Sequence, residues 1–250
     1  MSGVVTPAAR HPHDETTAAL PTQAEVMAQA GAENFPVALW LLGPSMRRDL
    51  LAIYGFARLV DDIGDEVDGD RLALLAQVER ELDAPVHPAI VRVTRTIAAR
   101  GLPRDPFVRL IDANREDQVV TEYASTDALW HYCMLSAAPI GELVLHLFGA
   151  ATADRIALSD RVCAALQVIE HLQDVEEDAA RGRRYIGAFD AYAYAHELLR
   201  AGPPLVRGLQ GRAKIAVAGF LAGGRVALAE LEHGQRPSFT FELARAVAGR

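Results

Sequence analysis

The sequence predicts an all-α protein built as a single helical bundle. Apolar residues recur mostly at helical spacing from Gly31 onward, whereas strand-like alternation with turn pairs is scarce. Half of the 250 residues are apolar, which is enough for one sizeable core. Glycine, proline and acidic clusters divide the pattern into about eight to ten helices of ordinary length.

The N-terminal end differs from the rest of the chain. Residues 1–21 contain no apolar run after a basic start, so they do not resemble a signal peptide, and we expect a disordered tail. The helical domain is expected over residues 22–250, and its segment 71–82, RLALLAQVEREL, shows the amphipathic pattern clearly. Breaks between helices are expected at residues 43–44, 68–70, 84–85, 101–103, 124–127, 149–153, 182–187 and 202–204.

The composition excludes several classes of protein. Lys and Arg number 25 against 33 Asp and Glu, so the formal charge of -8 argues against a nucleic-acid partner. Cys133 and Cys163 have no second cysteine nearby, which indicates packed thiols in a reducing cytoplasm. The most apolar run, 215–224, lies between Lys214 and Arg225 and is shorter than the roughly 20 residues that span a bilayer.

The segment YGFARLVDDIGDE, residues 54–66, carries four acids near its end. Steps of four, three and four residues place Tyr54, Arg58, Asp61 and Asp65 on one face of a helix whose other faces are apolar. A lone acidic helix end is most often a solvated surface. Carboxylates on an enclosed face instead need a compensating cation, and hard oxygen ligands suit Mg²⁺ together with a phosphate group.

A second acidic stripe follows about 110 residues later in VCAALQVIEHLQDVEEDAARGRRY, residues 162–185. Gln167, Glu170, Asp174 and Asp178 follow at steps of three, four and four, and three arginines come directly after. Two matched stripes inside apolar helices favour a shared Mg²⁺ and diphosphate site, with the arginines holding the anion. His171 lies one residue off the stripe and is expected to be a packed histidine.

The long apolar helix expected over residues 129–149 carries Tyr132, Ser136 and Pro139 on one face, and Pro139 should kink it. Its small residues indicate either close helix packing or space for an apolar ligand. With diphosphate sites at one end, that ligand would be an isoprenoid tail. The glycines of residues 219–224 lack the Gly-x-Gly-x-x-Gly spacing, so no nicotinamide cofactor is indicated.

Taken together, these segments resemble the squalene/phytoene synthase family of all-helical prenyl-transferring enzymes. The resemblance runs from about Gly31 to Arg236, in the family's order. Its pieces are ENFPVALWLL, AIYGFARLVDDIGDE, LIDANREDQVVTEY, YCMLSAAPIGELVLHLFG, LQVIEHLQDVEEDAARGRRY and GGRVALAELE. It implies the isoprenoid synthase fold, a helical bundle around a central apolar cavity.

The resemblance also implies roles for individual residues. The Mg²⁺ ligands that it implies are Asp61 and Asp65 of the first aspartate-rich motif and Asp174 and Asp178 of the second; Glu170, from the acidic stripe of residues 167–178, is expected as a further ligand. The expected catalytic residues are Tyr132, Tyr54 and Arg58. The expected substrate-binding residues are Phe35, Arg58, Gln167, Arg183 and Tyr185. Tyr132 matches the tyrosine beside the reacting carbons, where its ring or hydroxyl can stabilise a cation.

Within the family, ENFPVA and the Gln-Asp-Val form of the second motif are most similar to the bacterial hopanoid branch that makes hydroxysqualene. That branch ionises presqualene diphosphate and traps the cation with water. Alternatives are head-to-head condensation of two farnesyl or geranylgeranyl diphosphates, cyclisation of one, or a non-catalytic helical partner protein. The expected ligand is therefore an isoprenoid diphosphate, in the cytoplasm, and contacts with pathway enzymes or with the inner face of the membrane are left open.

Three departures from the family pattern limit this transfer. The His-Ser-Lys-type segment that helps hold diphosphate in other branches reads Gly-Ala-Glu at residues 31–33. The asparagine usual before the second motif is Glu170, which adds charge. The segment after Tyr185 is short and has Gly187 in place of the usual proline, so we expect a changed wall of the cavity.

Overall fold

The structure is a computed structural model that describes residues 20–22 and 43–250, and the regular structure of these residues is helical. The all-α prediction is confirmed. Most of the predicted tail, the Gly-Ala-Glu segment at 31–33 and Phe35 lie outside the described residues. At the end of the tail, Leu20 packs against the folded body and the carbonyl oxygen of Pro21 lies 2.8 Å from Nε2 of His87.

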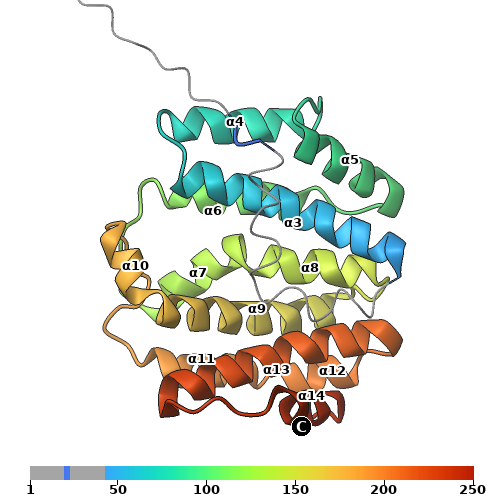
Figure 1. The fold of residues 1–250 in the computed structure, drawn as a ribbon, viewed down its shortest axis with the longest axis vertical. Coiled ribbons are helices and arrows are strands. Elements are labelled where there is room, and N and C mark those ends of the chain that lie inside the picture. Colours follow the sequence, from blue (N-terminus) through green and yellow to red (C-terminus); the bar gives the residue numbers. More distant parts are fainter. Residues whose placement is uncertain (1–19, 23–42) are drawn as a thin grey trace, which may run out of the picture.

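The first four described helices form the upper half of the molecule in Figure 1. They are α3 (Pro44–Asp65), α4 (Arg71–Glu81), α5 (Pro88–Arg100) and α6 (Asp105–Glu116). Proline occupies the first turn of α3, α5 and α6, where a missing N–H costs nothing, and Asp70 caps α4. Their shared core includes Phe56 and Phe107, whose rings meet edge to face at 5.3 Å.

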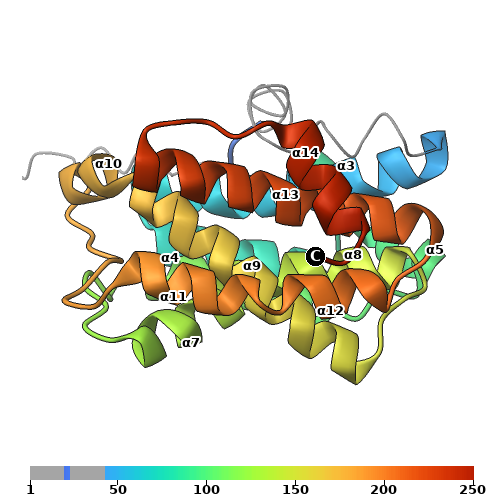
Figure 2. The same cartoon turned by 90° about the horizontal axis from the view of Figure 1, so that it is seen from below.

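The remaining helices form the lower half in Figure 1, and Figure 2 shows the same stack from below. They are α7 (Thr126–Ser136), α8 (Ala138–Leu147), α9 (Ala153–Gln173), α10 (Val175–Ala180), α11 (Ala191–Leu199), α12 (Gly202–Arg207), α13 (Gly211–His233) and α14 (Phe239–Val247). Helix α8 lies between the halves, because Leu143 and Leu147 pack into the upper core and Leu145 into the lower one.

The expected kink near Pro139 is confirmed as a break between α7 and α8 at Ala137. Proline occupies the first turn of α8, and the two helices are bent by 40°. Within the described residues, no single helix is long and apolar enough to cross a membrane. The bent pair α7 and α8 meets the criteria of length and composition only when its two helices are counted together.

Glycines allow the central helices to approach closely. A Cβ added at Gly141 of α8 would overlap the side chains of Ser159 and Cys163 on α9. A Cβ at Gly224 of α13 would overlap the Leu166 side chain, which is also on α9. Helix α9 is therefore held tightly between α8 and α13, which fixes the position of the residues near its C-terminal end.

Candidate active site

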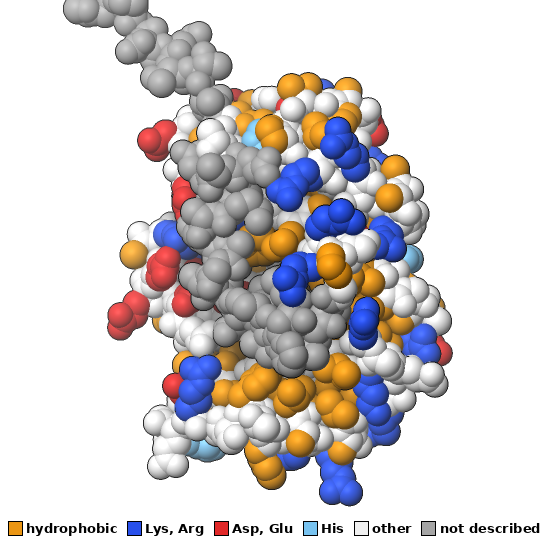
Figure 3. Space-filling view, turned by 45° about the vertical axis from the view of Figure 1, so that its right-hand side comes forward, with side chains coloured by type: hydrophobic (Ala, Val, Ile, Leu, Met, Phe, Trp, Pro, Cys, Tyr) orange, Lys and Arg blue, Asp and Glu red, His pale blue; other side chains and the backbone are white. Residues whose placement is uncertain are grey.

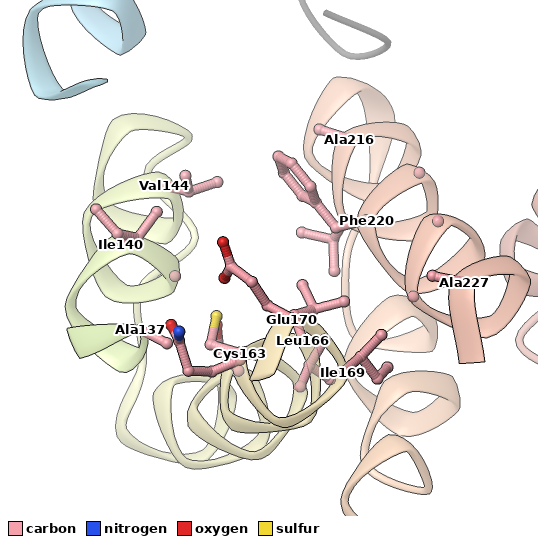
Figure 4. Close-up of a pocket in the computed structure, with 18 of the residues that line it drawn as sticks. Ala137, Ile140, Val144, Cys163, Leu166, Ile169, Glu170, Ala216, Phe220 and Ala227 are labelled. Carbon is pink, nitrogen blue, oxygen red and sulfur yellow. The ribbon is translucent and has the colours of Figure 1, made fainter. Parts of the chain in front are cut away.

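Two adjoining cavities lie in the middle of the bundle. The larger, of about 930 Å³, is lined mainly by apolar residues of α3, α8, α9 and α13. Figure 4 shows Ile140, Val144 and Phe220 around this space, with the carboxylate of Glu170 pointing into it. The smaller cavity, of about 440 Å³, is lined mainly by polar residues from the C-terminal ends of α3 and α9 and from α10. Six residues line both cavities: Arg58, Asp61, Leu110, Ser136, Gln167 and Glu170.

The four acids at the end of α3 have two different tasks. Asp61 and Asp65 line the polar cavity. Asp62 and Glu66 bind Arg58, with Arg58 Nε 2.6 Å from Asp62 Oδ1 and Nη2 2.9 Å from Glu66 Oε1, and Glu66 also borders the polar cavity. The second pair of acids therefore fixes a guanidinium group beside both cavities, close to the carboxylates of the first pair.

Protein surrounds Asp61 on several sides, but its side chain is exposed to the cavity. Burial raises its pKa to about 7; the hydrogen bond from Asn114 opposes this rise and the charge of Asp65 adds to it. Asn114 Nδ2 donates to Asp61 Oδ1 at 3.0 Å. Gly64 makes this contact possible, because a Cβ at that position would overlap the Asn114 side chain.

The second acidic stripe is not one continuous helix, so the sequence prediction is wrong here. Helix α9 ends at Gln173, and Asp174, with φ -104° and ψ 17°, separates it from the short α10. Aspartate is a poor helix former, and Glu176, Glu177 and Asp178 crowd like charges into the following turn. Asp174 and Asp178 still line the polar cavity, but they reach it from two helices.

His171 is buried and packed, as predicted, and it organises its neighbours. Its ring stacks on Tyr185 with centroids 3.8 Å apart. Its Nδ1 lies 3.3 Å from Asp178 Oδ2, and its Nε2 lies 3.3 Å from Gln167 Nε2. The histidine thereby connects an expected metal ligand, an expected substrate-binding amide and an expected substrate-binding tyrosine.

Asp117, which the sequence analysis did not identify, is the centre of a buried aromatic cluster. Tyr132 donates its hydroxyl to Oδ2 at 2.8 Å, and Tyr185 donates to Oδ1 at 2.7 Å. Burial raises the pKa of Asp117, although both hydrogen bonds and the charge of Arg183 oppose the rise. Burial and the nearby carboxylate also raise the pKa of Tyr132 well above its usual value, so its hydroxyl stays protonated.

A signal for Asp117 was present in the segment 110–123, where Asn114 and Asp117 follow the apolar Leu110 at steps of four and three residues and so share its helix face. Both line the polar cavity.

The chain after α10 connects the two acidic motifs. Arg183 Nη1 lies 2.5 Å from Asp65 Oδ1, with the arginine side chain only 11% exposed. The backbone N–H of Arg184 donates to Thr121, and its carbonyl accepts from Tyr123. Gly187, where the family usually has proline, leaves space for the Tyr123 carbonyl, which a Cβ would overlap.

The structure brings together every sequence-predicted site residue that it describes. Tyr54 lines the apolar cavity, and Arg58, Asp61, Gln167 and Glu170 line both. The predicted site residues that line only the polar cavity are Asp65, Tyr132, Asp174, Asp178, Arg183 and Tyr185.

The donor set fits Mg²⁺ in chemical type. All five expected ligands are carboxylates facing the polar cavity, and Mg²⁺ typically binds through one or two carboxylates, waters and substrate phosphate. Within the described residues, no three His, Cys, Asp or Glu side chains form a ready-made metal cluster. The carboxylates on α3 and those around α10 therefore suit a metal that a diphosphate helps to hold.

The comparisons with known proteins point to one family. The sequence profile of the squalene/phytoene synthase family matches residues 28–191. The chain is 37% identical over 211 residues to a hydroxysqualene synthase of Rhodopseudomonas palustris, an alignment covering 80% of this chain and 72% of the relative. It is 38% identical over 153 residues to a hydroxysqualene synthase of Zymomonas mobilis, covering 58% and 51%. The matched region thus spans about half the length of some of these relatives.

Solved structures agree. A squalene synthase from Alicyclobacillus acidocaldarius superposes with a TM-score of 0.75 at 33% identity, covering 83% of this chain and 91% of that one. A dehydrosqualene synthase superposes with a TM-score of 0.69 at 19% identity, covering 90% and 94%, and supports the fold.

An all-helical bundle with a carboxylate-lined cavity opening into an apolar one defines the class of isoprenoid synthases. The chain belongs to the squalene/phytoene synthase family. Its relatives are enzymes, and enzymes of this family act on isoprenoid diphosphates and generally use a divalent metal.

Proposed function

We propose that this chain ionises presqualene diphosphate with the help of Mg²⁺ and adds water to the cation, giving hydroxysqualene. The observation that carries the proposal is that the two cavities adjoin and share six lining residues, because one substrate could then place its diphosphate among carboxylates and arginines and its hydrocarbon among apolar helices. The relatives at 37% and 38% identity are named hydroxysqualene synthases, which supports this reaction.

Different residues would bind the diphosphate and the hydrocarbon of the substrate. Asp61, Asp65, Asp174, Asp178 and Glu170 are the residues proposed to hold Mg²⁺, which when bound would neutralise the departing diphosphate. Arg58 is held beside the site by Asp62 and Glu66, so it offers the anion a guanidinium that is already positioned. The apolar cavity orients the hydrocarbon and excludes bulk water.

Tyr132 contributes its ring in this proposal. Its hydroxyl is already donated to Asp117, and its raised pKa keeps the proton in place. The π-face of a buried tyrosine stabilises a nearby cation by electrostatic attraction. Tyr132→Phe should therefore reduce turnover by less than about tenfold, whereas Tyr132→Ala should lower both turnover and stability.

Two rival functions share this geometry. Relatives named presqualene diphosphate synthase are 33% and 32% identical, so condensation or cyclisation of farnesyl or geranylgeranyl diphosphate is the second candidate. A non-catalytic partner protein is disfavoured, because both pairs of aspartates remain and line one cavity.

Peripheral membrane contact also belongs to the proposal, because the substrate is lipid-like. On the face shown in Figure 3, apolar side chains gather beside basic side chains over the lower helices. Helices α13 and α14 expose Ile215 and Phe241. Contact with other pathway enzymes stays a prediction.

Product analysis tests the proposed reaction. The protein is incubated separately with presqualene, farnesyl and geranylgeranyl diphosphates in ¹⁸O-labelled water, with and without a nicotinamide cofactor. We expect a labelled alcohol from presqualene diphosphate in both cofactor conditions. A condensed or cyclised hydrocarbon from the other two substrates, without labelled alcohol from presqualene diphosphate, would replace the proposal with the rival.

A further inference from the structure

Ser136 stands where the two cavities meet. It is the last residue of α7, just before the break at Ala137, and it lines both the apolar and the polar cavity. A cation formed from a substrate that spans the two cavities lies near this junction. Ser136 is the only hydroxyl-bearing residue among the six described residues that line both spaces.

The Ser136 hydroxyl is buried and makes no hydrogen bond within the described part of the chain. A serine inside a helix commonly donates to the carbonyl oxygen four residues earlier, and Ser136 does not. Leaving a buried hydroxyl without a partner destabilises a protein. Ser159, a second serine facing the apolar cavity, instead has its Oγ 3.9 Å from Cys163 Sγ. Of the two described serines that line the cavities, Ser136 is therefore the one whose hydroxyl has no partner.

Four other polar residues line the junction, and of these Glu170 is an expected metal ligand while the other three have side-chain partners. Asp61 accepts from Asn114, and Arg58 is bound by Asp62 and Glu66. The Gln167 amide lies against His171. A hydroxyl group can accept one hydrogen bond from a water and leaves the oxygen lone pair of that water free to attack a cation.

The geometry points to Ser136 as the residue that holds the water molecule captured by the carbocation, an inference that rests on the proposed function. In the step, the carbon–oxygen bond to diphosphate breaks with its electron pair leaving on diphosphate. The cyclopropylcarbinyl cation rearranges, and the water oxygen forms the new carbon–oxygen bond. One water proton passes to the released diphosphate, so presqualene diphosphate and water give hydroxysqualene and hydrogen diphosphate.

The test compares Ser136→Ala, Ser136→Thr and the wild-type protein with presqualene diphosphate in ¹⁸O-labelled water. In Ser136→Ala we expect the ratio of labelled alcohol to hydrocarbon formed by proton loss to fall about tenfold or more, while diphosphate release falls much less. Ser136→Thr keeps a hydroxyl and should keep the alcohol. Thr96→Val is the matched control, because it removes a buried hydroxyl of α5 that bonds to Arg92 and lines neither cavity.

The outcomes separate this inference from the proposed function. If the wild-type protein makes labelled alcohol and Ser136→Ala makes it in the same ratio, the role of Ser136 is overturned and the reaction stands. If the wild-type protein makes no labelled alcohol, the proposed reaction fails and the role of Ser136 fails with it. As a readout independent of turnover, crystal structures should show an ordered water on Ser136 Oγ that is lost in Ser136→Ala; no water in the wild-type structure contradicts the inference.

Discussion

The two acidic motifs have similar spacing in the sequence but different structures. The first lies on one uninterrupted helix, α3, and Asn114 and Arg183 already bind its two cavity-facing carboxylates. The second is divided at Asp174, and α10 buries none of its residues. The difference indicates that the first motif is preorganised by protein contacts. The second, although Asp178 contacts His171, lies partly on a short helix without buried residues and has more room to adjust when metal and diphosphate bind.

The largest effect is expected from removing one carboxylate of each motif. Asp61→Asn and Asp174→Asn should each reduce diphosphate release by about a hundredfold or more, since each removes a ligand charge but little volume. Chelation of divalent metal should act similarly on the wild-type protein. Circular dichroism should show an intact helical fold, and thermal unfolding should show Asp61→Asn at least as stable as wild type, because Asp61 is an enclosed carboxylate. Wild-type release by both variants contradicts the metal assignment.

The contact between the motifs can be broken at Arg183. Arg183→Ala should lower diphosphate release by about tenfold and destabilise the protein by about 1–3 kcal/mol, because Asp65 loses a largely buried partner. A double-mutant cycle with Asp65→Asn measures the coupling in urea unfolding. Arg184→Ala is the matched control, since its side chain is 70% exposed. Additive effects of Arg183→Ala and Asp65→Asn would show that the motifs are energetically independent.

Glycine substitutions should separate packing in the first motif from space in the apolar cavity. Gly64→Ala should destabilise the protein by about 1–3 kcal/mol, because the new Cβ would overlap Asn114. Gly219→Ala in α13 should stabilise it by about 0.5–1 kcal/mol, because a Cβ there meets nothing within 4 Å and alanine favours the helix. Chemical denaturation measures both values. If both variants change the free energy of unfolding equally, the proposal that packing preorganises α3 is contradicted.

The smallest effect concerns pH and the opposite end of α9. Burial raises the pKa of Asp160 to about 6, although the charge of Arg109 opposes the rise. The folded state therefore favours the protonated form, so this contribution to stability is complete below about pH 4 and is lost as the pH rises through about 6. Urea unfolding of wild type and Asp160→Asn between pH 4 and 7 should show a shallower decline in the variant. If the stability of both proteins falls equally with pH, Asp160 is not the cause of the decline.

Local sequence patterns predicted much of the fold and of the candidate site. Helical spacing placed Tyr54, Arg58, Asp61 and Asp65 on one face of α3, and a proline marked the break between α7 and α8. These features depend on residues within a few turns of each other, which is the range over which periodicity is informative.

The remaining features depend on contacts between distant segments. Asp117 matters because Tyr132 and Tyr185 arrive from other parts of the chain. The residues around Asp174 follow helical spacing although the helix is interrupted there. The sequence pattern could not predict this interruption, because it arises from the backbone angles of a single residue. The ion pairs of Asp62 and Glu66 with Arg58 depend on the conformation of the Arg58 side chain.

The backbone pairing of Arg184 with Thr121 and Tyr123 has a consequence for protein engineering. It connects the loop between α6 and α7 to the chain that carries Arg183 and Tyr185, so an insertion or deletion in residues 118–123 would shift both side chains without altering either acidic motif. Libraries that vary the length of this loop would therefore retune the anion-binding end of the site while leaving the hydrocarbon end unchanged. Such changes should be tolerated best near the exposed Val119, because Tyr123 at the other end of the loop is buried in the core.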